Sequence, residues 1–376
     1  MREYFIKYGL FLLLACCTRI SAAAQVANSG LMDTTGGEKL GRISIGGYID
    51  TYYGYYFASA PDGNVPYMVS MARANELNIN LAYIDLRYHG ERIRARFVPG
   101  LGAYMNANYA AEPGLLKNIV EASAGVKLFK KKEIWLDAGI LGSPYTNESA
   151  VSRDHLMYTR SFAPEYVPYY LAGAKLGIPL HSKVTAWLYF LNGWQQIRDQ
   201  NRGKSFGSQL EYRPASRHLL NWNTYIGDER SAQNPDFRLR YFTDVYWIFN
   251  PEGRVSITSC AYIGMQERRM TELHISRPVW WQANFIARWN FHKTVSLSGR
   301  VEYFSDPHRV MINPLNAMPG FSAWSAGLCM NVKIRRNAMF RLEGRHFVSD
   351  RNVYAGAGAK PQASSTWVVS NLCVWF

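Results

Sequence analysis

The stretch VWWQANFIARWNF, residues 279 to 291, alternates between two kinds of side chain. Every odd-numbered position from Val279 to Phe291 is apolar, whereas Gln282 and Asn284 are polar residues at even-numbered positions. Successive side chains of a β-strand point to opposite faces, so this pattern predicts a strand with one continuous apolar face. The segment is longer than the roughly five or six residues of a usual strand. Its length and alternation are typical of a tilted strand that crosses a bilayer.

Two further segments repeat the pattern with arginines on the polar face. DFRLRYFTDVYWIF, residues 236 to 249, alternates in the same way, and ERIRARF, residues 91 to 97, carries an arginine at every second position. In a soluble sheet these arginines would face bulk water, and in a transmembrane barrel they would face a watery lumen. Seven residues do not separate the two alternatives, so the rest of the chain has to decide.

The connections between such segments alternate in length. We count about 16 candidate strands, which begin near residues 43, 76, 91, 118, 133, 169, 183, 204, 217, 236, 254, 279, 294, 321, 337 and 365. Short polar turns such as HGE (89 to 91) and NPEGR (250 to 254) follow the even-numbered strands, and longer loops such as 58 to 75 follow the odd-numbered ones. A soluble sandwich has no reason to sort its loops in this way. The alternation predicts an all-β fold, a closed antiparallel transmembrane barrel with short periplasmic turns and long extracellular loops.

The N-terminus has the features of a secretory signal. Two basic residues precede the apolar run YGLFLLLACC, and the small residues Ala22 and Ala24 follow it. We therefore expect a cleaved signal peptide at 1–24, a short periplasmic segment at 25–42 and the barrel at 43–376. Lipoprotein processing at Cys16 is the alternative. No later apolar stretch is long enough for a transmembrane helix, and although the formal net charge is +14, an exported chain is not expected to bind nucleic acid.

The last residue is an aromatic one. In WVVSNLCVWF the terminal Phe376 shares the apolar face of a final strand, which resembles the signal by which the barrel-assembly machinery recognises bacterial outer-membrane proteins. Together with the signal peptide and the loop alternation, this feature predicts integration into the lipid of a Gram-negative outer membrane.

Three parts of the chain also carry a family resemblance. GGYIDTYYGYYF (46 to 57), NINLAYIDLRYHGERIRARF (78 to 97) and the region from LDAGILGSPYTNES to MYTRSFAPEYVPYYLAGAKLG (136 to 177) resemble the OmpL-like β-barrel porins. The similarity is densest between residues 43 and 180. What the resemblance implies is an outer-membrane pore for passive diffusion of small hydrophilic solutes, with no cofactor.

The polar faces of the strands would line the lumen of such a barrel. The basic candidates are Arg92, Arg94, Arg96, Arg238, Arg240, Arg288, Arg300, Arg341 and Arg345, and the acidic ones are Asp50, Glu121, Asp137, Asp244, Glu302 and Glu343. An excess of fixed positive charge concentrates anions, so the sequence predicts a weak anion preference and passage of small anionic or neutral solutes. The alternative is that these charges pair across neighbouring strands and only stiffen the wall.

The longest loop, residues 145 to 168, is the third long one in this count. We expect it to fold into the lumen as a constriction, as the third loop does in general porins, with Glu148, Arg153, Asp154, Arg160 and Glu165 as its charged residues. A loop that caps the barrel from outside is the alternative.

Enzyme signals are weak. GKSFG (203 to 207) matches the G-x-S-x-G pattern, but Ser205 opens a strand, whereas that chemistry needs a strand–turn–helix elbow. His155, with Asp154 and Ser152 nearby, does not make a triad by adjacency alone. We therefore predict that the protein is no enzyme, with a barrel-embedded hydrolase and a non-conducting structural or adhesive barrel as alternatives. By analogy with other porins of this size, a homotrimer is the expected assembly.

Overall fold

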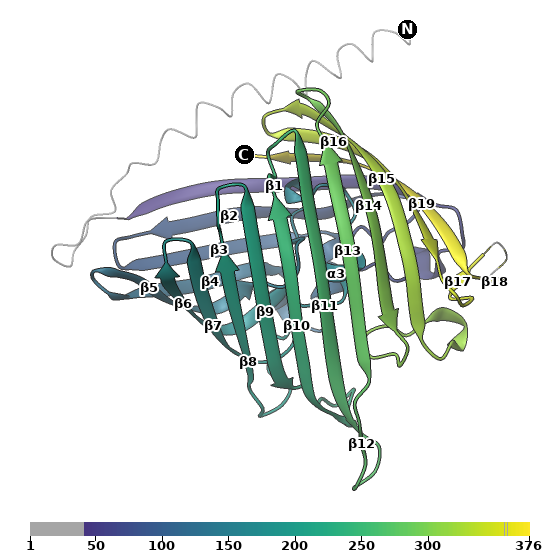
Figure 1. The fold of residues 1–376 in the computed structure, drawn as a ribbon, viewed down its shortest axis with the longest axis horizontal. Helices are drawn as coiled ribbons and strands as arrows, with labels where there is room; N and C mark the ends of the chain where they lie inside the picture. Colours follow the sequence, from purple (N-terminus) through teal and green to yellow (C-terminus); the bar gives the residue numbers. More distant parts are fainter. Residues whose placement is uncertain (1–40, 357, 359) are drawn as a thin grey trace. The chain divides into compact units, whose positions relative to one another are not determined.

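The fold is a single closed β-barrel, shown in Figure 1. The computed structural model describes residues 41–376 except 357 and 359. The expected signal peptide and Cys16 lie outside the described residues, as does most of the expected segment 25–42. These expectations stay predictions.

Sixteen long strands form the wall of the barrel in the described part of the chain. They are β1 (Arg42–Tyr56), β2 (Leu77–His89), β3 (Ile93–Leu101), β4 (Ile119–Phe129), β5 (Lys132–Gly142), β6 (Tyr170–His181), β7 (Val184–Leu191), β8 (Ser205–Tyr212), β9 (His218–Asp228), β10 (Phe237–Phe249), β11 (Val255–Arg269), β13 (Val279–Trp289), β14 (Val295–Asp306), β15 (Phe321–Arg335), β16 (Ala338–Val348) and β19 (Ser364–Trp375). The predicted starting positions differ from these by at most two residues, because a period of two is hard to misplace along a long strand.

Each strand pairs antiparallel with its neighbours, and the last strand closes the barrel against the first. Tyr48 lies opposite Trp375, and the register continues to Tyr56 opposite Trp367. The backbone of Phe376 also exchanges two hydrogen bonds with Gly47. In Figure 1 the yellow end of the chain accordingly returns to the purple β1.

The two faces of the wall differ as the alternation predicted. In β13 the odd-numbered residues from Trp281 to Trp289 are mostly exposed on the outside, whereas Gln282 and Asn284 are buried on the inside. Outward aromatic residues gather at both rims, with Tyr55 and Trp281 toward the long loops and Trp289 toward the short turns.

The short turns lie at one end of the barrel, which we call the turn end, and the long loops lie at the other, the loop end. Short elements occur within the loops, namely η2 (Pro61–Gly63), α2 (Ala103–Asn108), η3 (Gly114–Asn118), η4 (Ser152–Asp154), α3 (Phe162–Glu165), β12 (Ile275–Ser276), η5 (Leu315–Ala317), β17 (Tyr354–Ala355) and β18 (Pro361–Gln362). No helix among the described residues is long and apolar enough to cross a membrane.

Toward the loop end the inside of the barrel is filled by apolar side chains. Loop residues such as Met71, Phe162 and Tyr354 pack with inward residues of the wall, among them Trp280 and Trp367, in one buried cluster. Several of the loops therefore do not simply cover the barrel, because part of each of these enters it.

Candidate functional site

The longest loop, residues 145–168, lies inside the barrel, and we call it the inner loop. Its backbone N–H groups at Tyr158 and Thr159 donate to the carboxylate of Glu343 on β16 over 2.9 and 2.8 Å. The N–H group of Phe162 donates to Glu302 on β14 over 2.5 Å. The alternative in which this loop caps the barrel from outside is wrong.

A buried ion network holds this part of the inner loop. The Arg300 guanidinium lies 2.9 Å from Glu343 and 3.1 Å from Glu302, and Arg345 lies 2.5 Å from Glu302. All four side chains have no exposed surface. Arg300 and Arg345 also donate to backbone carbonyls of the inner loop. These charges therefore satisfy one another and the loop instead of facing open space. Their pairs lie within β14 or reach from β14 to β16, so they do not join neighbouring strands.

Other predicted lumen residues also bind the inner loop. Arg341 donates to the carbonyl and hydroxyl oxygens of Ser152 over 2.7 and 2.8 Å, and the same hydroxyl donates to Asp50 over 3.0 Å. Asp244 accepts from the backbone N–H of Thr146 over 2.7 Å. Each of these contacts spans about a hundred residues or more of sequence, so single-strand patterns could not reveal them.

Three predicted lumen arginines lie near the barrel rims or in the apolar cluster. Arg240 is buried, and its guanidinium lies 5.0 and 5.4 Å from the ring centres of Trp194 and Trp280. Arg238 folds back to the carbonyl of Pro235 near the loop end. Arg92 precedes β3 and lies exposed in the turn, so it is not part of the arginine row on the strand.

The two arginines within β3 are paired. Arg94 donates twice to Asp137 over 2.6 and 2.5 Å. Arg96 lies between two carboxylates, 2.8 Å from Asp85 and 2.5 Å from Glu121. The two arginines therefore brace the four consecutive strands β2 to β5, because each guanidinium is already neutralised across the wall.

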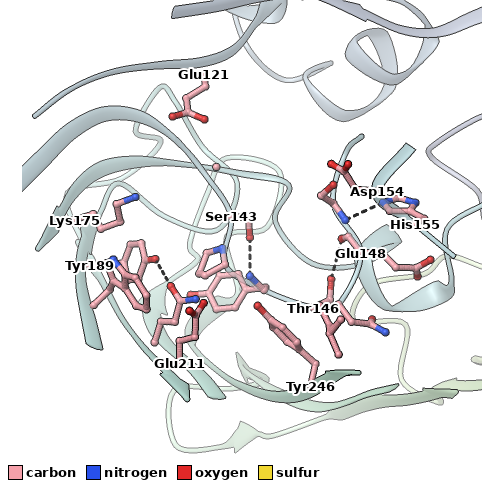
Figure 2. Close-up of a pocket in the computed structure, with 18 of the residues that line it drawn as sticks. Glu121, Ser143, Thr146, Glu148, Asp154, His155, Lys175, Tyr189, Glu211 and Tyr246 are labelled. Atoms are coloured by element: carbon pink, nitrogen blue, oxygen red, sulfur yellow. Dashed lines mark hydrogen bonds between the residues drawn. The ribbon is translucent and has the colours of Figure 1, made fainter. Parts of the chain in front are cut away.

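An open cavity of about 550 Å³ remains beside the inner loop (Figure 2). The wall contributes Lys175, Trp187, Tyr189 and Glu211 to its lining, and the inner loop contributes the segment Tyr145–Ser149 with Asp154 and His155. Figure 2 shows Lys175 and Tyr189 on one side of this lumen cavity and the loop residues Glu148, Asp154 and His155 on the other. A smaller adjoining cavity shares Arg96, Glu121, Lys175 and Trp187 with it.

Two loop residues that line the lumen cavity, Glu148 and His155, each have a buried polar atom without a partner among the described residues. Glu148 uses one carboxylate oxygen to accept from Ser161, and its other oxygen has no hydrogen bond among the described residues. His155 accepts from the Ser149 N–H through Nε2, and its Nδ1 is unpartnered in the same part of the chain. Burial, followed by the charge of Arg160, lowers the pKa of His155, so the imidazole is neutral at pH 7. A neutral ring that accepts at Nε2 carries its proton at Nδ1.

The other charged residues of the inner loop have different surroundings. Arg160 is fully buried and donates to the carbonyls of Ser149 and Ala150. Glu165 accepts from the N–H groups of Val69 and Ser70 in another loop. Arg160 therefore holds two parts of the inner loop together and Glu165 ties this loop to another, whereas Arg153, Asp154 and Glu148 line cavities.

A second cavity of about 800 Å³ lies at the turn end, and its lining is basic. Arg288, Lys333, Arg335 and Arg336 come from the wall and its turns. The other lining residues are Arg153, Asp154, Leu156, Pro251, Glu252, Met339 and Trp375. Asp154 lines both this turn-end cavity and the lumen cavity, so the two polar spaces adjoin at the inner loop.

Sequence reasoning missed Lys175 and Trp187. A signal was present in GAKLG, residues 173 to 177, where two glycines flank the lysine at the strand period of two. On the inner face of β6 such glycines leave the lysine without covering neighbours. The lysine also lies opposite Asp137 on β5.

The residues of the weak enzyme signal do not meet. The Ser205 hydroxyl accepts from Tyr225, and the Ser152 hydroxyl donates to Asp50. Asp154 pairs with Arg153. Among the described residues no group of three or more His, Cys, Asp or Glu side chains could hold a metal ion. The cysteines Cys260, Cys329 and Cys373 are buried and free.

Comparison with known proteins agrees with this architecture. The sequence model of the family described as "Putative beta-barrel porin-2, OmpL-like" matches residues 42–376. No curated protein sequence matches the chain.

Solved structures share the fold at low sequence identity. The outer membrane channel DcaP of Acinetobacter baumannii is 8% identical with a TM-score of 0.61, and the match covers 91% of this chain and 100% of that one. An anion-selective porin from Comamonas acidovorans is 8% identical with a TM-score of 0.56, and the match covers 89% and 100%. OmpT of Vibrio cholerae in its trimer form is 8% identical with a TM-score of 0.57, and the match covers 90% and 100%.

Proposed function

The chain belongs to the OmpL-like β-barrel porin family and is an integral outer-membrane barrel, and from this premise we propose that it conducts small hydrophilic solutes with a weak preference for anions. The observation that carries the proposal is the pair of polar cavities that adjoin at Asp154 on the inner loop. Water and solutes can occupy such spaces, whereas the buried ion network keeps the loop against one wall.

The anion preference rests on the turn-end cavity, which we take to face the periplasm. Five basic side chains line it, against the two acidic side chains Asp154 and Glu252. Lys333, Arg335 and Arg336 are exposed and make no side-chain hydrogen bond or ion pair with any described residue. Unpaired fixed charges at a pore mouth raise the local concentration of counter-ions. The paired arginines of β3 contribute little to this field, because Asp85, Glu121 and Asp137 neutralise them.

Charge reversal at this mouth should change the ion selectivity. In the double variant Arg335→Glu with Arg336→Glu, the chloride-to-potassium permeability ratio should fall by about twofold or more, since the mouth then attracts cations. The measurement is the reversal potential of single channels in a planar bilayer with a salt gradient.

The matched control is Lys130→Glu with Lys131→Glu, which makes the same change of charge in the exposed turn between β4 and β5. These two lysines do not line the turn-end cavity, so the control should keep the selectivity of the unmodified protein. Equal shifts in both variants would contradict a local role for the turn-end cavity.

A non-conducting structural barrel is the second candidate, because the apolar cluster fills the inside toward the loop end. A sealed barrel would give no stable current steps in a planar bilayer, whereas a porin would. We also propose that the protein is no hydrolase. If the purified protein hydrolysed a lipid or a peptide and the Ser205→Ala variant lost that activity, this proposal would be wrong.

For partners, we propose outer-membrane lipid around the wall and the barrel-assembly machinery during insertion. The Vibrio cholerae structure named above is a trimer form, and we propose a homotrimer for this chain as well. Cross-linking in native outer membranes, followed by gel analysis, tests this assembly. A band only at the monomer position would contradict it.

A further inference from the structure

The charges on the wall from β2 to β6 do not balance. Three arginines are paired with three carboxylates, namely Arg87 and Arg96 with Asp85, Arg96 with Glu121, and Arg94 with Asp137. Lys127 on β4 pairs with Glu133 on β5. Lys175 is a further cation on the same wall, and it makes no hydrogen bond or ion pair with any described residue. The surplus positive charge of this wall is therefore the ammonium of Lys175.

The register explains why Lys175 has no hydrogen bond or ion pair among the described residues. It lies directly opposite Asp137 on β5, but both oxygens of that carboxylate accept from Arg94. The inward neighbours of Lys175 on its own strand are Gly173 and Gly177, which have no side chain to cover it. The ammonium thus faces the lumen cavity.

An aromatic surface lies beside this ammonium. Trp187 on β7 is opposite Gly177, and a Cβ at that glycine would lie 3.0 Å from the indole nitrogen. Gly177 therefore gives the indole room to lie over the wall next to Lys175. Tyr189, which is opposite Lys175 on β7, and Tyr246 extend the aromatic lining of the cavity.

The same cavity repels a second negative charge. Four carboxylates line it, those of Glu121, Glu148, Asp154 and Glu211. Of its two lining cations, Arg96 is paired and Lys175 has no ion pair among the described residues. A multiply charged anion would approach these carboxylates, whereas one carboxylate can reach the ammonium while the rest of the ligand lies on the indole. The volume of about 550 Å³ is within the usual range for a small-molecule site.

We propose that Lys175 and Trp187 form a binding site for small monocarboxylates that carry a ring, with the carboxylate on the Lys175 ammonium and the ring on the Trp187 indole. The site deepens the proposed function and rests on it, because the ligand would be a solute that passes through the lumen.

Equilibrium binding to the purified, folded barrel tests the site. Benzoate and glucuronate should bind at least tenfold more tightly than acetate, which lacks a ring, and than benzyl alcohol, which lacks the charge. Lys175→Gln should weaken both ring acids at least tenfold without loss of folding, since the lysine has no partner to lose. Trp187→Leu should reduce the binding of ring acids to the level of acetate.

A second variant tests the site without changing Lys175 or Trp187. Arg94→Gln frees Asp137 to pair with Lys175, so it should weaken binding about as much as Lys175→Gln. Lys131→Gln, in the exposed turn between β4 and β5, is the control that should leave binding unchanged. Equal binding of acetate and the ring acids, or unchanged binding in Lys175→Gln, would overturn the proposal. Binding by one ring acid alone supports it and identifies the ring.

Conductance measured on the same samples separates this site from the proposed function. A protein that conducts ions but binds neither ring acid is a porin without this site. A protein that binds them through Lys175 but gives no current steps has the site, and in that case the porin proposal fails.

Discussion

Replacing Glu343 with alanine should release the inner loop from the wall and raise the single-channel conductance severalfold. The Glu343 carboxylate accepts from two backbone N–H groups of the loop and from the Thr159 hydroxyl, and it pairs with Arg300. It has no exposed surface. Breaking a buried ion pair on one side costs ~3–5 kcal/mol, because the remaining charge is left uncompensated. Part of this cost should be relieved when the loop swings away and water reaches Arg300.

Two measurements check this expectation, namely current amplitude in a planar bilayer and the urea concentration at which the barrel unfolds. We expect a larger and noisier current together with a lower unfolding midpoint. Glu133→Ala is the control, since this exposed residue pairs with Lys127 at the turn end, and it should change neither value. An unchanged conductance in a folded Glu343→Ala barrel would show that the loop does not set the pore size.

The sequence was sufficient to predict the wall of the barrel, because the pattern that predicts a strand lies within that strand. Alternation such as that of residues 279 to 291 depends only on neighbours within one strand, so strand positions, the inward face and the loop alternation follow from it. Even the partners of Arg96, namely Asp85 and Glu121, follow once adjacent strands are placed in order.

The contacts inside the barrel could not be predicted from the alternation within single strands. Glu343 meets Thr159 across 184 residues, and Arg341 meets Ser152 across 189. Such contacts depend on the path of a loop through the lumen, and the sequence of a loop has no regular period from which its path could be predicted. The arginines predicted to face solute therefore include several that are bound to the inner loop. Lys175, which has no ion pair in the described part of the chain, was not singled out.

Deleting Phe376 should lower the amount of folded protein in the outer membrane at least tenfold. Its backbone exchanges two hydrogen bonds with Gly47 at the seam between β19 and β1. Phe376 is 74% exposed on the outside of the barrel, where an assembly factor could contact it. A residue with two seam bonds contributes only a small part of the stability, since a typical hydrogen bond is worth about 0.5–1.5 kcal/mol. A tenfold loss of assembled protein would then come mainly from the loss of recognition of Phe376 by the barrel-assembly machinery.

Two variants separate recognition from stability. Phe376→Tyr keeps an outward aromatic ring and should assemble normally, whereas Phe376→Ala keeps the backbone bonds and should fail almost as the deletion does. Refolding of the purified chains into detergent, followed as the shift in gel mobility between heated and unheated samples, should succeed for all of them. If Phe376→Ala refolds as poorly in detergent as it assembles in cells, the ring is needed for barrel closure itself. The apolar contact of the ring with the seam at Gly47 would then be the reason, because a Cβ at that glycine would lie 2.4 Å from the ring.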